Sequence, residues 1–520
     1  MTFRALLAAA SGLSLAACAN MASLGGAPSG APEARNAAPA PAAVYTPADH
    51  DGPGADWRAV ADAELADRLN RPQREGRAKN VILFVADGLS VGTITAARIL
   101  DGQLRGETGE ENYLPFERWG HTALIKTYNE NAQVPDSAGT ASALHTGVKT
   151  HVGAISVYAR DGVEACRPGH PVPATILERA EDRGMATGLV ATARLTHATP
   201  ATAYAHLTSR NWEVDAVLPP EAVAAGCRDL ARQLIEFDRG DGIELALGGG
   251  RAAFLTSDQG GQRTDGRDLT AEFAARGDYV ADLSGFRALD PASERPVLGL
   301  FAPSHLAYAH DRDPEAEPSL EEMTAFAIDK LSRDEDGFYL LVEAGRVDHA
   351  HHGTNAHRAL TDALAFAQAV ERAAAMTDPD ETLIIVTADH GHVFTIAGYP
   401  RRGNPILGLV HPPAPDLSDS PTPPSPAQDG RPYTTLGYYT GPVRRPVDGD
   451  SLTQDQVLDP DYRQQAAVPM GSETHSGEDV AAFARGPWAH LVDGVMEQHT
   501  LNRIMTWALG WESVDEFPEE

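Results

Sequence analysis

The chain has 520 residues, of which 42% are hydrophobic and 6% aromatic, so it can bury a large core and is not disordered as a whole. Its 42 Lys and Arg residues against 73 Asp and Glu residues give a formal net charge of −31. This charge repels nucleic acid and anionic membrane surfaces at long range, so we expect no nucleic-acid partner. An anionic ligand would need local positive charge, such as bound metal ions and a few arginines.

Residues 1–18 have the pattern of an export signal. Arg4 is followed by an apolar stretch that is too short to span a bilayer. The tetrapeptide Leu15-Ala16-Ala17-Cys18 resembles a bacterial lipobox, which predicts a lipid on Cys18 and a protein anchored to a bacterial membrane in the periplasm or at the cell surface. The alternative is an ordinary signal peptide that is cut after a small residue.

Residues 19–55 are rich in Ala, Pro and Gly and predict a flexible tether, after which we expect one catalytic domain at 56–512. The two remaining cysteines, Cys166 and Cys227, are an even number in a chain that we expect to enter an oxidising compartment. They predict one disulfide, although their spacing also fits two unpaired thiols.

Continuous apolar runs alternate with helical patterns in the body of the chain. The runs predict buried strands at 81–87, 187–192, 243–247, 338–344 and 382–389. Helical spacing predicts helices at 57–70, 319–333 and 355–376. This alternation predicts an α/β fold with a large, mostly parallel central sheet that is covered by helices on both faces. A stretch rich in Pro, Gly and Asp at about 399–470 predicts an insertion.

Three of the predicted strands end in residue types that bind metals. Asp87, Glu343 and the pair Asp389-His390 stand at the ends of these strands, where ligands bind in doubly wound sheets. A single Asp after a strand is usually a helix cap or a turn residue, but agreement among three strands is hard to attribute to capping.

The segment 343–352 adds two carboxylates and three imidazoles within ten residues, and His475 is a further donor. Imidazole with carboxylate is typical of zinc sites, whereas a surface loop rich in His is the alternative for this segment alone.

Ser137 precedes small residues and a helical pattern, which place it near a helix N-terminus. Such a position favours anions and lowers the cost of an alkoxide. A plain helix cap by Ser137 or Asp136 is the bland alternative.

Five motifs together resemble the alkaline phosphatases over roughly residues 78–510. They are AKNVILFVADG (78–88), DSAGTAS (136–142), VEAGRVDHAHH (342–352), TADHGHVF (387–394) and SETHSGEDVA (472–481). The resemblance implies the sandwich fold of that family, with the insertion as its crown. It also implies an enzyme that hydrolyses phosphate monoesters through a phosphoserine on Ser137, while Arg210 grips the phosphate and inorganic phosphate acts as a product inhibitor.

The family's metal content would be two Zn²⁺ ions and one Mg²⁺ ion per subunit of a homodimer. By motif, the resemblance assigns Asp348, His352 and His475 to the first zinc site, Asp87, Asp389 and His390 to the second, and Asp87, Thr199 and Glu343 to magnesium.

His197 and His349 stand where vertebrate-type members carry two histidines, so the chain is similar to that branch. The resemblance implies that His392 orients a zinc-bound carboxylate and that Cys166 pairs with Cys227. Ala302 stands where vertebrate enzymes have a calcium-binding glutamate, and we therefore expect no fourth metal site.

Three other activities fit less well. A sulfatase needs Cys or Ser in a C/S-x-P-x-R setting, whereas Ala, Gly and Thr follow Ser137. Related phosphodiesterases lack the third metal site and this arrangement of arginines. A catalytically silent lipoprotein that binds phosphate or zinc would not need the serine.

Overall fold

The computed structural model describes residues 65–66, 68–416, 418, 420–445 and 451–512. The predicted signal segment, Cys18 and the predicted tether lie outside the described residues, as does most of the predicted helix at 57–70. Within the described residues, no helix combines the length and the hydrophobicity that are needed to cross a bilayer.

A ten-stranded sheet forms the centre of the described region, with the strand order β15-β2-β14-β8-β1-β7-β3-β4-β6-β5. The strands, in chain order, are β1 (Asn80–Ala86), β2 (His121–Lys126), β3 (Ala186–Arg194), β4 (Leu245–Gly249), β5 (Asp278–Val280), β6 (Val297–Leu300), β7 (Phe338–Ala344), β8 (Thr382–Thr387), β14 (Val480–Arg485) and β15 (Gly494–Glu497). The five strands predicted from apolar runs are β1, β3, β4, β7 and β8, and the parallel pairing predicted for them is confirmed.

The middle of the sheet is buried on both faces. Leu83 of β1 lies beside Leu341 of β7 on one side and Ile385 of β8 on the other, and every residue of these three strands is buried. This burial explains why the strands read as continuous apolar runs rather than alternating ones. The exception to the parallel pattern is β14, which runs antiparallel to both β2 and β8.

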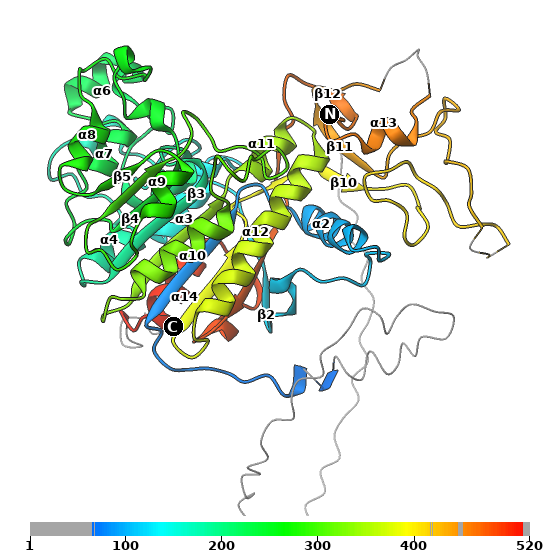
Figure 1. Cartoon of the computed structure of the whole chain (residues 1–520), viewed down its shortest axis with the longest axis horizontal. Coiled ribbons are helices and arrows are strands. Elements are labelled where there is room, and N and C mark those ends of the chain that lie inside the picture. The colour runs from blue at the N-terminus through cyan, green and yellow to red at the C-terminus, as the bar shows by residue number, and fades with distance from the viewer. Residues whose placement is uncertain (1–64, 67, 417, 419, 446–450, 513–520) are drawn as a thin grey trace, which may run out of the picture. The chain divides into compact units, whose positions relative to one another are not determined.

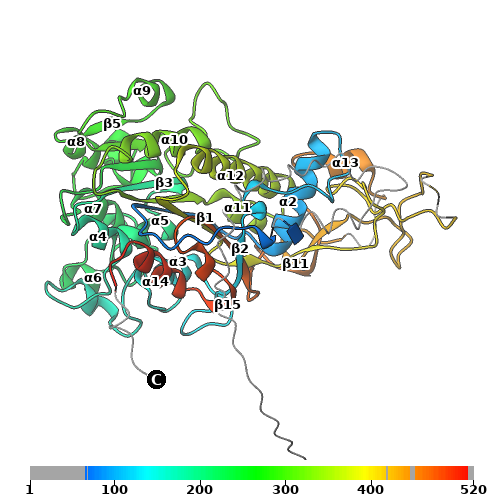
Figure 2. The same ribbon diagram turned by 90° about the horizontal axis from the view of Figure 1, so that it is seen from below.

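Helices cover both faces of the sheet, as predicted. Figure 2 shows α10 and α12 on one side of the sheet and α3, α4, α5 and α14 on the other. The helices are α2 (Val91–Leu104), α3 (Ser137–Thr146), α4 (Ile176–Glu181), α5 (Ala198–Tyr204), α6 (Pro220–Ala225), α7 (Leu230–Ile235), α8 (Leu269–Ala274), α9 (Leu283–Ala288), α10 (Leu320–Leu331), α11 (Arg346–His352), α12 (Ala356–Met376), α13 (Gln454–Leu458) and α14 (Thr500–Ala508). The predicted helices at 319–333 and 355–376 are α10 and α12.

The stretch that was predicted as an insertion contributes most of a second, smaller sheet. This three-stranded sheet joins β10 (Phe394–Ile396), β11 (Leu436–Gly441) and β12 (Ala466–Pro469). Figure 1 shows β10, β11, β12 and α13 on the opposite side of the described region from α6 to α9. Long loops rich in Pro connect these elements.

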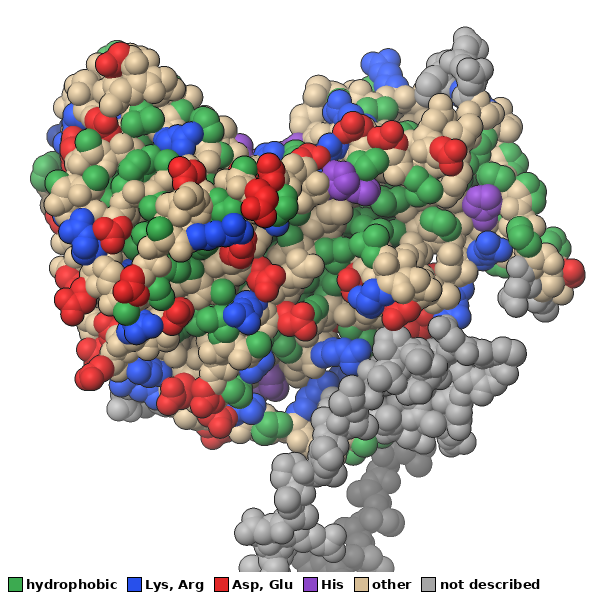
Figure 3. Space-filling model, viewed as in Figure 1, with side chains coloured by type: hydrophobic (Ala, Val, Ile, Leu, Met, Phe, Trp, Pro, Cys, Tyr) green, Lys and Arg blue, Asp and Glu red, His purple; other side chains and the backbone are tan. Residues whose placement is uncertain are grey.

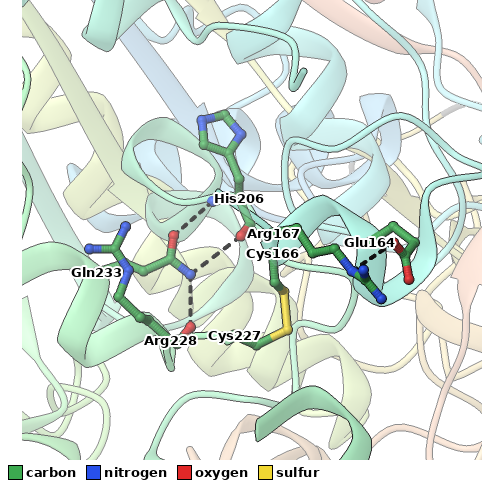
Figure 4. The surroundings of a disulfide bond; sticks show 7 residues. All are labelled: Glu164, Cys166, Arg167, His206, Cys227, Arg228 and Gln233. Carbon is green, nitrogen blue, oxygen red and sulfur yellow. Dashed lines mark hydrogen bonds and ion pairs between the residues drawn. A yellow bond between two sulfur atoms is a disulfide. The ribbon is translucent and has the colours of Figure 1, made fainter. Parts of the chain in front are cut away.

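Cys166 and Cys227 form a disulfide, as the resemblance implied, with 4.8 Å between their Cα atoms. Gln233 braces the surrounding loops, because its side-chain amide donates to the carbonyl oxygens of His206 and Arg228 (Figure 4). The bond therefore ties the loop before α4 to the segment between α6 and α7.

Candidate active site

The carboxyl ends of β1, β7 and β8 bring their polar residues to one edge of the sheet. Asp87 follows β1, Glu343 lies near the end of β7, and His390 follows β8. All three side chains are fully buried. Gly88 follows Asp87 with φ of 78°, and a Cβ atom at Gly88 would lie 2.4 Å from Nε2 of His392, so this close approach requires glycine.

A first group of donors comprises Asp348, His352, His392 and His475, whose ligand atoms lie within 4.8 Å of one another. Oδ1 of Asp348 is 3.2 Å from Nε2 of His352 and 3.3 Å from Nε2 of His475. The two Nε2 atoms of His352 and His475 are 3.2 Å apart. One carboxylate and two imidazoles thus converge on a single point, as ligands of one ion do.

Hydrogen bonds to the backbone orient the two half-buried imidazoles of this group, His352 and His475. Nδ1 of His352 donates to the carbonyl oxygen of Glu473 at 2.7 Å, and Nδ1 of His475 donates to that of Pro135 at 2.8 Å. A proton on Nδ1 leaves the lone pair of Nε2 free to face a cation.

A second group surrounds the hydroxyl of Ser137. Nε2 of His390 lies 3.1 Å from Oγ of Ser137, 3.3 Å from Oδ1 of Asp87 and 3.4 Å from Oδ2 of Asp389. Oδ1 of Asp87 is 3.4 Å from the same hydroxyl oxygen. The ligand atoms of Asp87, Asp348 and His390 also lie within 4.8 Å of one another, close enough to share an ion. Asp348 therefore belongs to both of the first two groups.

A third group contains Asp87, Glu343 and His197. The family resemblance assigned Thr199 to this site and gave His197 a supporting role. Thr199 lies next to Glu343 and is fully buried, and its hydroxyl has no hydrogen-bond partner in the described part of the chain. The structure therefore adds an imidazole to the predicted oxygen donors.

The carboxylates of this edge are costly to bury without cations. Burial raises the pKa of Asp87 well above its usual value, and repulsion from Asp389 raises it further. Burial and Asp389 likewise raise the pKa of Glu343 to about 8. Burial also raises the pKa of Asp389, to about 6. Oδ2 of Asp87, both carboxylate oxygens of Glu343 and Oδ2 of Asp389 have no hydrogen-bond partner among the described residues. Buried oxygens that lack donors fit metal ligation.

Asp348 shows the opposite behaviour. Burial alone would raise its pKa, but the imidazoles of His352, His392 and His475 hold the pKa well below its usual value. Nε2 of His392 is 2.8 Å from Oδ1 of Asp348, and Nδ1 of His392 is 2.6 Å from Oε2 of Glu473. Both ring nitrogens of His392 therefore face carboxylates, which raise its pKa to about 9 against the effect of burial.

Ser137 is the first residue of α3, and its side chain is 2% exposed. The N-cap is Asp136, whose Oδ1 accepts from the backbone N–H of Gly139 at 3.1 Å, so the capping role falls on Asp136 and leaves the hydroxyl of Ser137 available. Oδ2 of Asp136 also pairs with Arg210 at 3.3 Å, and the same guanidinium reaches Nε2 of His197 at 3.0 Å. Arg210 is thereby held beside the helix N-terminus that carries Ser137.

The structure brings the predicted residues to one edge and adds others that the sequence did not single out. Glu473 is buried and holds His392. The ring of His305 packs at a tilt against that of His349, with 4.1 Å between ring centroids, and the ring centroid of His349 lies 5.3 Å from that of His197. Glu473 lies within the motif at 472–481 but was given no role there, and no local pattern marks His305. In the space-filling view, the surface is hollowed between the lobe that carries α6 to α9 and the insertion, and histidines are visible there (Figure 3).

The sequence profile of the alkaline phosphatases matches residues 78–511. The chain belongs to the alkaline phosphatase family. It is 44% identical over 473 residues to the tissue-nonspecific alkaline phosphatase of Gallus gallus, which covers 87% of this chain and 88% of that protein. It is 43% identical over 474 residues to the alkaline phosphatase of Gadus morhua, with 87% and 96% covered.

Solved structures of alkaline phosphatases share this fold. The Thermus thermophilus enzyme is 26% identical, with a TM-score of 0.61, and the match covers 86% of this chain and 94% of that one. The enzyme from the Antarctic bacterium TAB5 has a TM-score of 0.57 at 22% identity, with 85% of this chain and all of the other covered. The predicted alkaline-phosphatase-like fold is therefore confirmed, and the chain is a metal-dependent hydrolase of phosphate monoesters, as its family is.

Proposed function

We propose that Ser137 is the nucleophile of this phosphatase. Its hydroxyl oxygen attacks the phosphorus atom, the bond from phosphorus to the ester oxygen breaks, and the departing alcohol takes up a proton. Water then cleaves the phosphoserine and releases inorganic phosphate, which competes with substrate as a product inhibitor. The observation that carries this proposal is the position of the Ser137 hydroxyl at a helix N-terminus, 3.1 Å from His390 and 3.4 Å from Asp87.

The three donor groups fit two Zn²⁺ ions and one Mg²⁺ ion. The first zinc ion would be held by Asp348, His352 and His475, and the second by Asp87, Asp389 and His390. Oxygen donors of Asp87, Thr199 and Glu343 would hold magnesium, with His197 beside them. Bound there, the ions would lower the pKa of the serine hydroxyl and of water and offset charge on the oxygens of the ester.

Arg210 binds the phosphate group in this proposal. Its planar guanidinium can donate to two phosphate oxygens at once, and the contacts with Asp136 and His197 fix its plane beside Ser137. The ring of His349 lies beside that of His197, on the same side of the site as Arg210. His392 is a positioning residue, because it holds the carboxylate of Asp348.

For the whole protein we propose export and attachment to a bacterial membrane through a lipid on Cys18, with Cys18 as the first residue after cleavage. The lipobox and the Ala- and Pro-rich residues 19–55 support this proposal. The two histidines at 197 and 349 support the vertebrate-type branch. A homodimer rests on the family resemblance.

The proposal is tested by hydrolysis of a chromogenic phosphate monoester at alkaline pH, together with elemental analysis of the same sample. We expect turnover that a chelator abolishes and that zinc with magnesium restores, at about two zinc ions and one magnesium ion per chain, as two-metal chemistry requires. A metal-loaded protein that binds phosphate but shows no turnover would instead indicate a binding protein.

A further inference from the structure

Arg463 lines two cavities, one beside His349 and one within residues 431–465. The first has a volume of about 380 Å³, and its lining includes His349, Tyr308, Arg358, Asp461 and Arg463. The second has a volume of about 200 Å³, lies within the insertion and includes Arg463 in its wall. Arg463 therefore lies at the boundary of both cavities.

The first cavity opens beside the residues that we assign to phosphate binding. The ring of His349 lies 5.3 Å from that of His197, and Nε2 of His197 accepts from Arg210 at 3.0 Å. Arg346 adds positive charge next to this cavity. Its guanidinium lies 3.7 Å from the ring centroid of Tyr308, which lines the cavity, and its Nε is buried without a hydrogen-bond partner among the described residues.

The second cavity has several arginines in its wall. Four arginines line it: Arg431, Arg444, Arg445 and Arg463. The guanidinium of Arg445 pairs with both oxygens of Asp429, at 2.8 and 2.9 Å, and that of Arg431 pairs with the same carboxylate at 2.8 Å. One carboxylate is thus shared between two arginines.

Among the described residues, the other two arginines have no such partner. Within the described residues, no carboxylate forms an ion pair with Arg444 or Arg463, and Nε of Arg463 donates to the carbonyl oxygen of Gly353 at 2.6 Å. The hydroxyl of Tyr462, which lines the same cavity, is buried and has no partner in the described part of the chain. Clustered like charges repel one another, so this arrangement is favourable when an anion binds between them.

The negative charge of the whole chain sets these four arginines apart as a place where an anion can bind. At a net charge of −31, the protein repels anions everywhere except where positive charge is concentrated. Planar guanidinium groups match the oxygens of phosphate and carboxylate better than other donors do.

We propose that the cavity lined by Arg444 and Arg463 binds a second anionic group on the alcohol portion of the substrate, so that the enzyme favours phosphate monoesters whose alcohol carries another phosphate. This inference rests on the proposed function, because the first phosphate must lie beside Ser137 and Arg210. The first cavity then accommodates the carbon chain that joins the two anionic groups.

The test compares α,ω-alkanediol bisphosphates of two to eight carbons with the alkyl monophosphates of the same length. For each pair we would measure the ratio of kcat/KM, bisphosphate over monophosphate, for the metal-loaded full-length protein. We expect this ratio to rise at one preferred chain length and to fall about tenfold in Arg444→Gln and in Arg463→Gln, since each removes a charge-assisted contact. Arg444→Lys should restore part of the ratio.

The matched control is Arg333→Gln, just after the end of α10, where the Arg333 guanidinium forms an exposed ion pair with Asp329 at 3.3 Å. It should leave the ratio unchanged. The preference for bisphosphates should also shrink as ionic strength rises, because salt screens exposed charges. A ratio that is equal in the wild type and both cavity variants would overturn the inference while leaving the phosphatase assignment intact. An absence of turnover with every ester would overturn both.

Discussion

The hydroxyl oxygen of Ser137 lies 3.1 Å from Nε2 of His390, although 253 residues separate the two in the chain. The contact arises because α3 begins at Ser137 and because His390 follows β8 at the carboxyl edge of the sheet. Both side chains are almost fully buried. A cation that is held by His390 would therefore be a direct neighbour of the nucleophilic oxygen, at the end of a helix whose dipole favours negative charge.

Replacing Arg210 with Ala should weaken phosphate binding. The guanidinium offers charge-assisted contacts, so the inhibition constant of inorganic phosphate should rise by about 10- to 100-fold, equivalent to about 1.5–3 kcal/mol. Product-inhibition kinetics at saturating metal would measure this change. Arg333→Ala, in an exposed ion pair, is the control. An inhibition constant that stays at the wild-type value would remove Arg210 from its assigned role.

Replacing Glu473 with Gln should lower zinc affinity without touching a ligand. Oε2 of Glu473 holds Nδ1 of His392 at 2.6 Å, and Nε2 of His392 faces Asp348 at 2.8 Å. Loss of such an outer partner typically costs about 10- to 100-fold in metal affinity. Competition with a chelator would report this loss, and excess zinc should recover the activity. Glu478→Gln, an exposed site five residues later, should behave as the wild type.

The disulfide between Cys166 and Cys227 should stabilise the folded state by closing a long loop. The two cysteines are 61 residues apart, and chain entropy predicts a contribution of about 4 kcal/mol, with measured cases ranging from about 0 to 5. We expect the Cys166→Ser, Cys227→Ser double variant to unfold at a lower denaturant concentration than the wild type. Equal midpoints for the two proteins would show that the bond contributes nothing.

Ionisation of Glu181, which lies outside the three donor groups of the site, should make the free energy of unfolding depend on pH. Burial, together with Asp241 and Asp182, raises its pKa from 4.5 to about 7, and its carboxylate accepts from Thr187 and from the backbone of Gly242. Because the folded-state pKa is the higher one, the stabilisation is complete below pH 4.5 and is lost as pH rises through about 7.

Glu181→Gln cannot ionise, so it does not lose this stabilisation. Relative to the wild type, its free energy of unfolding should rise by about 1–2 kcal/mol as pH increases from about 5 to 8. Chemical denaturation across this range would measure the difference. The exposed Glu335→Gln is the control. A difference between Glu181→Gln and wild type that does not vary with pH would contradict the prediction.

Much of the fold followed from local sequence, because strands that are buried on both faces must be continuously apolar. β1, β7 and β8 are recognisable for this reason, and the ligands at their ends follow from the parallel arrangement. The antiparallel strand β14 was not predicted, since it pairs with β2 and β8, which are distant in sequence, and no local pattern marks that pairing.

The site, too, combines residues that local sequence predicts with residues that it does not. Asp87 and His390 stand directly after strands, so sequence placed them at the shared edge. Glu473 and His305 act through packing against histidines from other segments, which only the folded chain reveals. The entry of His197 into the third donor group also depends on how α5 packs against β7 rather than on its own motif.

Trapping of the phosphorylated protein tests the central claim most directly. Metal-loaded protein would be mixed with labelled inorganic phosphate, quenched in acid, digested and mapped by mass spectrometry. The account predicts one labelled peptide with the phosphate on Ser137, and no label in Ser137→Ala despite a metal content close to that of the wild type. Phosphate on another residue, or full turnover by Ser137→Ala, would contradict it.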